Sequence, residues 1–248
     1  MTRLTLLATL TVCGVSMAQE KSADCSNWHV RKLDRAPDWY LAAVDAPMIG
    51  SVTKIGDSLE RTDYVLNDSV TLVQYQHETF EALNEMEWDS WFAPGSLYLC
   101  GRDTVLLDSC AYGYSELSFS GNNRMCVAKE TEFIGPDGGT SAIVQYDLVR
   151  GTKTVLRSYV VGVPPRYEPV YLSLIAYTDF ADLYIVYPGE AGELVFSRGG
   201  GYAQEGECRG RWINDVRWSP DGRSLVFKYY DTFPPSGDYE LWEASWSR

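Results

Sequence analysis

Few residues of this chain carry catalytic chemistry at a recognisable spacing. The 248 residues include two histidines, His29 and His77, and neither has a second histidine at metal-ligand spacing. Residues 113–117 (Gly-Tyr-Ser-Glu-Leu) begin like the nucleophile elbow of serine hydrolases but lack its closing glycine. A serine hydrolase also needs a histidine and a carboxylate placed against its serine. We therefore expect no catalytic residue of this kind.

Carboxylates are abundant, with 34 Asp and Glu against 21 Lys and Arg. Two of them could serve as the acid and nucleophile of a glycosidase. Glu85 and Glu87 lie beside Trp88 and Trp91, an acidic and aromatic patch that could hold a sugar or form a solvated loop. A carbohydrate-active enzyme that uses paired carboxylates is therefore the alternative function.

Metal and phosphate signatures are missing from the sequence. Residues 137–139 (Asp-Gly-Gly) and 221–222 (Asp-Gly) resemble fragments of calcium loops but lack the spaced oxygen ligands of such a loop. No phosphate-cradling GxxxxGK[ST] run occurs. We expect no cofactor and no bound metal.

The clearest structural element is a turn of sequence Ser-Pro-Asp-Gly at residues 219–222, between apolar strands at 213–218 and 224–228. Proline presets the first corner, aspartate hydrogen-bonds nearby backbone, and glycine accepts a positive φ. Residues 117–128 align with residues 216–227, with Ser-Gly-Asn-Asn in the turn. We interpret residues 171–187 as a degenerate copy, in which Tyr177 takes the place of Phe119 and Trp218. A spacing of about 40–50 residues is typical of propeller blades.

The repeat resembles the TolB-type, WD-repeat-like β-propellers, in which a strand, an S-P-D-G turn and a second strand form the inner half of each blade. Residues 212–245 carry the resemblance most strongly, followed by residues 116–158. The resemblance implies an all-β fold, a β-propeller of about five four-stranded blades, with four or six as alternatives. Propellers of this family commonly act as protein-interaction platforms of the cell envelope or as regulatory domains of peptidases.

Other segments fit this architecture. Hairpins are expected at 96–108 and 142–157, single strands at 39–44 and 68–75, and one or two turns of helix at 78–87. The last unit has three strands (213–218, 224–228 and 239–245) and lacks a fourth. An open strand edge promotes aggregation, so we expect an N-terminal strand at 28–33 to close the last blade.

The first 18 residues are expected to be a signal peptide. Arg3 precedes an uncharged apolar run at 4–15, and small residues at 16 and 18 predict cleavage before Gln19. Residues 19–248 then form a single propeller domain that is periplasmic or secreted. Lipid anchoring through Cys13 is the alternative, although Val12 stands where a small residue is normally required. No apolar run is long enough for a membrane span.

The formal net charge of −13 excludes nucleic acid as a partner, because an acidic surface repels phosphates. Export permits disulfides, and at most two can form among the five cysteines after residue 18. Their pairing stays open, as does the alternative of buried thiols. These cysteines are Cys25, Cys100, Cys110, Cys126 and Cys208.

The connections between strands predict where a partner binds. In an up-and-down blade, the first and third turns leave one side of the ring, and they are short here. The other side receives longer loops at 130–141, 158–169, 198–211 and 229–238, with a tight turn at 188–192 as the exception. Loops on a rigid scaffold commonly hold function, and aromatic residues suit an interface. We expect a protein or peptide partner of the cell envelope to contact Phe133, Asp137, Arg166, Tyr167, Tyr202, Tyr230, Asp231 and Phe233.

Overall fold

The computed structural model describes residues 27–42, 50–56, 59–77, 94–110, 113–115, 117–135, 138–170, 174–187, 190, 192–198, 210–231 and 238–247, with the backbone alone at 42, 132–135, 138 and 139. These residues form four antiparallel sheets and one short helix, α1 (Asp38–Ala42). The chain is therefore all-β, as the repeat predicts.

The sheets are numbered I to IV in chain order. Sheet I contains β2 (Ser51–Ile55), β3 (Leu59–Asn67), β4 (Val70–His77), β5 (Gly95–Cys100) and β6 (Thr104–Cys110). Sheet II contains β7 (Ser118–Phe119), β8 (Met125–Gly135), β9 (Gly138–Asp147) and β10 (Thr152–Val160). Sheet III contains β11 (Arg166–Tyr167), β12 (Ile175–Asp179), β13 (Asp182–Val186) and β14 (Glu193–Phe196). Sheet IV contains β15 (Trp212–Trp218), β16 (Ser224–Tyr230), β17 (Glu240–Trp246) and β1 (Trp28–Leu33).

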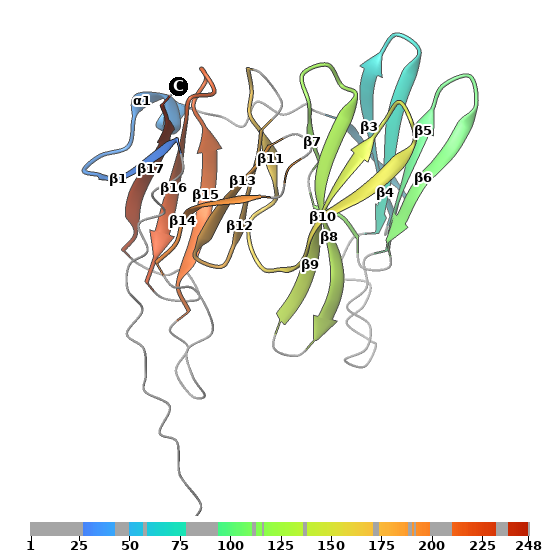
Figure 1. The fold of residues 1–248 in the computed structure, drawn as a ribbon. Helices are drawn as coiled ribbons and strands as arrows, with labels where there is room; N and C mark the ends of the chain where they lie inside the picture. The colour runs from blue at the N-terminus through green and yellow to red at the C-terminus, as the bar shows by residue number, and fades with distance from the viewer. Residues whose placement is uncertain are drawn as a thin grey trace, which may run out of the picture.

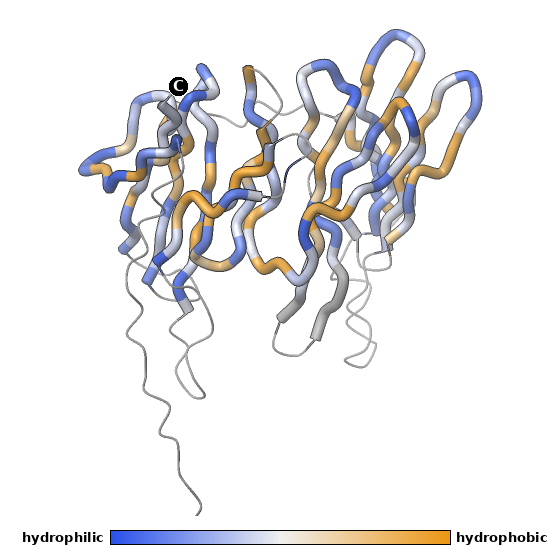
Figure 2. Tube along the Cα trace, viewed as in Figure 1, coloured by the Kyte–Doolittle hydropathy of each residue, from blue (hydrophilic) through white to orange (hydrophobic). Residues whose placement is uncertain are grey.

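Figure 1 shows the four sheets side by side, with sheet IV at the left and sheet I at the right. Buried side chains fill the spaces between neighbours: Leu183 and Phe227 between sheets III and IV, for example, and Leu97 and Tyr146 between sheets I and II. A third cluster joins sheets II and III. Figure 2 shows the apolar residues recurring along the strands of each sheet. The described residues are thus arranged as a row of four successive blades. About five were expected, with four as an alternative. No core cluster of the described residues combines sheet I with sheet IV.

The predicted Ser-Pro-Asp-Gly turn joins β15 to β16. The Ser219 amide donates to the Ser224 carbonyl (2.8 Å), and the Ser224 amide donates to the Ser219 hydroxyl oxygen (2.9 Å). Asp221 accepts hydrogen bonds from the Ser219 hydroxyl (2.7 Å) and the Arg223 amide (3.1 Å). Gly222 has a φ of +68°. The serine, the aspartate and the glycine of the turn therefore each have a contact or a backbone conformation that accounts for them.

The turn between β7 and β8 repeats these contacts. The Ser120 amide donates to the Met125 carbonyl (2.9 Å), and the Met125 amide donates to the Ser120 hydroxyl oxygen (3.0 Å). Asn122 accepts from the Arg124 amide (3.1 Å), in the place of Asp221. Asn123 has a φ of 52°, in the place of Gly222. The sequence alignment of these two turns is therefore confirmed in the hydrogen bonds.

The third copy has a different register from the one expected. Tyr177 lies on β12, the second strand of its sheet, whereas Phe119 and Trp218 lie on first strands. The matching first strand is β11, because the Glu168 amide donates to the Leu174 carbonyl (2.9 Å) and closes the equivalent turn. Tyr167 therefore takes the place of Phe119 and Trp218. The expectation was wrong because Glu-Pro-Val replaces the serine-led turn, so the sequence conceals it.

The N-terminal strand of the last blade is confirmed. Strand β1 pairs with β17 along its whole length, from Trp28 opposite Trp246 to Leu33 opposite Leu241. Trp28 is buried, and its indole N–H donates to the Tyr187 hydroxyl of sheet III (2.8 Å). Sheet IV is thus completed by residues from the opposite end of the chain.

Three expectations are corrected or fall outside the described residues. A strand was expected at 39–44, but α1 begins at Asp38, where the Pro37 carbonyl accepts the amides of Tyr40 and Leu41. The loop expected at 130–141 is largely the β8–β9 hairpin, which extends beyond its neighbours in Figure 1. The described part does not include residues 78–87, the signal peptide expected at 1–18, Cys13, Cys25 or Cys208. Cys100 and Cys126 are free thiols.

Candidate functional site

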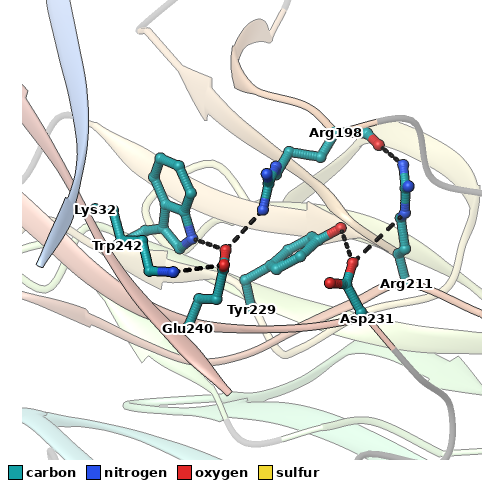
Figure 3. A network of polar contacts seen from close by, with 7 residues as sticks. All are labelled: Lys32, Arg198, Arg211, Tyr229, Asp231, Glu240 and Trp242. Atoms are coloured by element: carbon teal, nitrogen blue, oxygen red, sulfur yellow. Dashed lines mark hydrogen bonds and ion pairs between the residues drawn. The ribbon is translucent and has the colours of Figure 1, made fainter. Parts of the chain in front are cut away.

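Seven residues form a polar and aromatic network at one end of sheet IV, and we call it the sheet IV network (Figure 3). Its members come from five separate stretches of chain: Lys32 of β1, Arg198 after β14, Arg211 before β15, Tyr229 and Asp231 at the end of β16, and Glu240 and Trp242 of β17. The network lies where the chain leaves sheet III for sheet IV and where β16 turns toward β17. This is the end that the sequence predicts to carry the longer loops.

Strand pairing sets the positions of the aromatic members. Tyr229 is opposite Glu240, and Phe227 is opposite Trp242. Because side chains alternate along a strand, these four point to the same face of sheet IV. That face packs against sheet III, so Tyr229 and Trp242 end the core and begin the network.

Arg198 is the central cation of the network. Its guanidinium carbon lies 5.2 Å from the ring centroid of Tyr229 and 5.2 Å from that of Trp242. Phe196 supports both rings, at centroid distances of 5.9 Å and 5.1 Å. An arginine held over aromatic faces is fixed in orientation, which reduces the entropy lost when it binds a partner.

Glu240 is the anion against which the cations are arranged. Its carboxylate accepts hydrogen bonds from Lys32 Nζ (2.6 Å), Arg198 (2.6 Å) and the Trp242 indole (3.0 Å). The hydrogen bond from Lys32 is the main reason why the pKa of Glu240 lies below its ordinary value. Glu240 is therefore ionised at neutral pH and organises the site rather than acting as an acid.

Asp231 forms the outer part of the network and is the most exposed of its charged side chains, at 67%. It accepts a hydrogen bond from the Tyr229 hydroxyl (3.0 Å) and pairs with Arg211 at 3.7 Å. Burial, aided by this hydrogen bond, raises the pKa of Tyr229 to about 12. Arg211 also donates to the Arg198 carbonyl, which ties the two arginines together.

The charge of the network differs in sign from that of the whole chain. Lys32, Arg198 and Arg211 face two carboxylates, Glu240 and Asp231, in a protein of formal net charge −13. The network therefore has one more positive than negative charge, and its cations lie beside aromatic rings. This composition can bind a carboxylate or an acidic segment, and it contains no nucleophile with a partnering base.

The residues predicted from the sequence are divided between the two ends of the sheets. Asp231 belongs to the sheet IV network, and Tyr230 precedes it on the opposite face of β16, with its ring 5.8 Å from that of Tyr239. Asp137, Tyr202 and Phe233 lie outside the described residues, and only the backbone of Phe133 is described, in β8.

Arg166 and Tyr167 are not on the predicted binding end. They form β11, next to the turn equivalent to 120–124 and 219–223, and only 7% of Tyr167 is exposed. The Tyr167 amide donates to the Ser118 hydroxyl (3.0 Å), its own hydroxyl accepts from Gln145 (2.7 Å), and the Arg166 carbonyl accepts from the Trp218 indole (3.3 Å). Tyr167 thus fills the space between sheets II and III, which leaves its side chain no surface for a partner.

The sequence pattern did not predict a role in the site for five members of the network: Lys32, Arg198, Arg211, Glu240 and Trp242. The alternation of Glu240 and Trp242 on the last strand is a signal that they share a face. No local signal links them to Arg198, because that contact depends on how sheet III meets sheet IV.

A second charged cluster joins sheets I and II. Lys153 Nζ lies 2.8 Å from Asp108 and 2.6 Å from Glu130, and the buried Tyr146 donates its hydroxyl to Asp108 (2.6 Å). Burial alone would raise the pKa of Asp108, but the hydrogen bonds from Lys153 and Tyr146 outweigh it, and the pKa is lowered. A glycosidase acid needs a raised pKa, so Asp108 supports the contact between sheets and not acid catalysis.

This cluster predicts a loss of stability in acid. The folded-state pKa of Asp108 is below that of the unfolded chain, so its stabilisation is fully present above the unfolded pKa of about 4 and is lost as the pH falls through the folded pKa. We expect Asp108→Asn to lower the free energy of unfolding by about 1–3 kcal/mol at pH 7 and by progressively less as the pH falls below about 4. Urea unfolding of both proteins across this range measures the difference. Asp103→Asn, in an exposed turn, is the control. If the difference in unfolding free energy between the wild type and Asp108→Asn stayed the same at every pH, Asp108 would not be the source of the acid sensitivity.

The described residues contain no group of three or more His, Cys, Asp and Glu side chains that could hold a metal ion. Within the same residues, no helix has the length and apolar character needed to cross a membrane.

No protein-family model matches the sequence, and no curated protein matches it. Among solved structures, an oligogalacturonate lyase in complex with manganese is 12% identical with a TM-score of 0.40, over 79% of this chain and 69% of the lyase. TolB from Acinetobacter baumannii is 13% identical with a TM-score of 0.40, over 78% of this chain and 53% of TolB. An oligogalacturonate lyase from Vibrio parahaemolyticus is 14% identical with a TM-score of 0.37, over 79% of this chain and 71% of that one. At this level of likeness, we argue the function from the residues of this chain.

Proposed function

We propose that this chain is an exported, non-catalytic propeller-type platform that binds a protein or peptide partner through the sheet IV network. The observation that carries the proposal is Arg198, stacked against Tyr229 and Trp242 and bordered by exposed charges. Arginine is among the residue types most enriched in binding hot spots, and Arg198 is the exposed member of this stack. The buried Tyr229 and the half-buried Trp242 hold its guanidinium in place before a partner arrives.

The charges indicate which kind of partner segment suits this site. Three cations surround the aromatic rings while the rest of the chain is strongly acidic. Complementary charge steers association and suppresses partners of the wrong sign. We therefore propose an acidic segment, or a free carboxylate at a chain end, as the group that contacts Arg198 and Arg211.

Export supports the choice of partner class. The proposed signal peptide at 1–18 would place the mature protein in the cell envelope or outside the cell. The partner is then a protein of that compartment, and nucleic acid remains disfavoured by the overall charge.

Affinity capture with matched variants tests this proposal. Residues 19–248 are immobilised and exposed to an envelope extract, and the bound proteins are identified by mass spectrometry. We expect at least one protein to bind the wild type, and to bind Arg198→Ala/Arg211→Ala at least about tenfold more weakly, which corresponds to about 1.4 kcal/mol. These two arginines are the network members proposed to contact the acidic group of the partner.

The control is Arg150→Ala/Tyr159→Ala, a variant of exposed residues on sheet II. It should retain the partner with wild-type affinity, and both variants should keep the wild-type melting temperature. If both variants lost affinity equally, or if neither affected the partner, the binding site would not be the sheet IV network.

A further inference from the structure

A groove of about 420 Å³ crosses three strands of sheet I, far from the sheet IV network. It is lined by Leu59 of β3, Tyr75 and His77 of β4, Pro94 before β5, and Gly95, Ser96 and Tyr98 of β5. Its volume falls within the roughly 300–1,000 Å³ of small-molecule pockets. The function proposed above does not involve this groove.

The groove lies on the face of sheet I that points away from the core shared with sheet II. Leu72 and Leu97 point into the core shared with sheet II. Side chains alternate along a strand, so Tyr75, His77 and Tyr98 point to the opposite face. This face does not contribute to the core between sheets I and II, and at the groove Tyr75 and Tyr98 are half-buried and His77 is exposed.

Two tyrosines form the wall of the groove. The rings of Tyr75 and Tyr98 are 5.7 Å apart and nearly perpendicular, at 84°. The guanidinium carbon of Arg61 lies 5.8 Å from the centroid of the Tyr75 ring. One ring therefore presents its edge to the face of the other, and together they form an amphipathic corner.

Polar groups line the groove beside these rings. Ser96 is opposite Tyr75 in the strand pairing, and His77 is opposite Leu59. Among the described residues, the hydroxyls of Tyr75, Ser96 and Tyr98 and the imidazole of His77 have no hydrogen-bond partner. Each of these groups can take part as donor or acceptor, so the groove contains four unused hydrogen-bonding side chains.

The described residues that line the groove include no carboxylate and no ammonium group. Arg61, which lies beside Tyr75, is already paired with Asp63 at 2.9 Å. A charged ligand would lose its hydration without gaining a counter-charge, which disfavours both acidic and basic ligands. The chemistry of the groove therefore suits a neutral molecule with both apolar and hydroxylated surfaces.

We propose that this groove binds a neutral saccharide unit. A sugar ring has apolar C–H faces that pack against aromatic rings, and its hydroxyls both donate and accept hydrogen bonds. These two surfaces match the tyrosine corner and the four polar side chains. A proline-rich peptide also packs on aromatic rings, but its prolines have no N–H to offer Ser96 or His77, so it matches the groove less completely.

Titration with defined disaccharides tests the proposal. The probes are cellobiose, maltose and N,N′-diacetylchitobiose as neutral sugars, digalacturonic acid as a charged sugar, and an octaproline peptide. Binding to residues 19–248 is followed by saturation-transfer NMR. We expect at least one neutral disaccharide to bind with a Kd below about 10 mM, and neither digalacturonic acid nor octaproline to bind more tightly.

Variants locate the binding. Tyr98→Ala should weaken the bound disaccharide at least about tenfold, whereas Tyr98→Phe, which keeps the ring, should weaken it less. Tyr239→Ala removes an exposed tyrosine next to sheet IV and should leave the affinity for the disaccharide unchanged. Should Tyr98→Ala unfold, Ser96→Gln fills the groove without removing a ring and should give the same loss.

Three results would overturn the proposal. They are the absence of neutral disaccharide binding at about 10 mM, tighter binding of the charged sugar or the peptide, and a disaccharide affinity that neither Tyr98→Ala nor Ser96→Gln changes. None of these results depends on the sheet IV network, so the saccharide groove and the proposed partner site can fail separately.

Discussion

Replacement of Gly222 by alanine is expected to lower the free energy of unfolding by about 3 kcal/mol or more, through two separate costs. The first is conformational, because Gly222 has a φ of +68°, which L-residues with a side chain resist. The second is steric, because the new Cβ would collide with the carboxylate of Glu168 and lie 2.6 Å from its Cδ. Glu168 is fully buried, and its Oε1 accepts a hydrogen bond from the Val170 amide (2.7 Å), so the carboxylate cannot move away cheaply.

Gly151→Ala separates the two costs. Gly151 has a similar φ of +65°, but an added Cβ would meet no atom within 4 Å. We expect this variant to lose only about 1–2 kcal/mol, the cost of the left-handed conformation alone. Denaturant unfolding measures both variants. Equal losses in the two would show that Glu168 yields to the added methyl group.

The combined variant Gly222→Ala/Glu168→Ala provides the coupling energy. Glu168→Ala removes the atoms with which the new Cβ collides, so in this background Gly222→Ala should cost about as much as Gly151→Ala. An additive double variant would contradict the steric argument. The test thus examines a single contact between sheets III and IV.

The parts of the fold that were predicted depend on short stretches of sequence. The turn at 219–222 was predicted because Pro, Asp and Gly each favour one position of a tight turn, and the structure gives each that position. The β5–β6 and β9–β10 hairpins were predicted from the same kind of local pattern. Trp28–Leu33 was predicted from the missing fourth strand of the last unit.

The parts that were missed depend on contacts between sheets. Residues 39–44 have the composition of a strand, but α1 packs Tyr40 against Val226 and Leu241, on the face of sheet IV away from sheet III. Tyr167 was predicted to contact a partner because it lies in the long connection at 158–169. Its burial follows from the position of β11 beside β7, which the sequence does not reveal.

The candidate site is the least predictable part of the molecule. Lys32 and Glu240 are 208 residues apart in the chain, and Arg198 and Glu240 are 42 apart. Each residue is unremarkable in its own segment, and the network exists only because β1 pairs with β17 and sheet III packs on sheet IV. Only Asp231 was anticipated, because it follows a strand at the end where the longer loops were expected.

Removal of strand β1 is expected to cause aggregation as well as loss of stability. A protein that begins at residue 34 loses the whole pairing from Trp28 to Leu33, which leaves β17 as an exposed edge. It also loses the Trp28 side chain, which is 5% exposed and packs 6.2 Å from the Trp218 ring centroid. Size-exclusion chromatography with light scattering should show soluble aggregates, and the melting temperature should fall.

Two comparison proteins show which part of β1 is responsible. A protein that begins at residue 27 keeps the strand and should remain monodisperse with an unchanged melting temperature. Trp28→Ala keeps the backbone pairing but removes the buried ring, so it should lose about 3–5 kcal/mol without aggregating in the native state. Aggregation of Trp28→Ala to the same extent as the truncated protein would assign the effect to the core. A monodisperse truncated protein with wild-type melting would show instead that β17 does not need β1 to cover its edge.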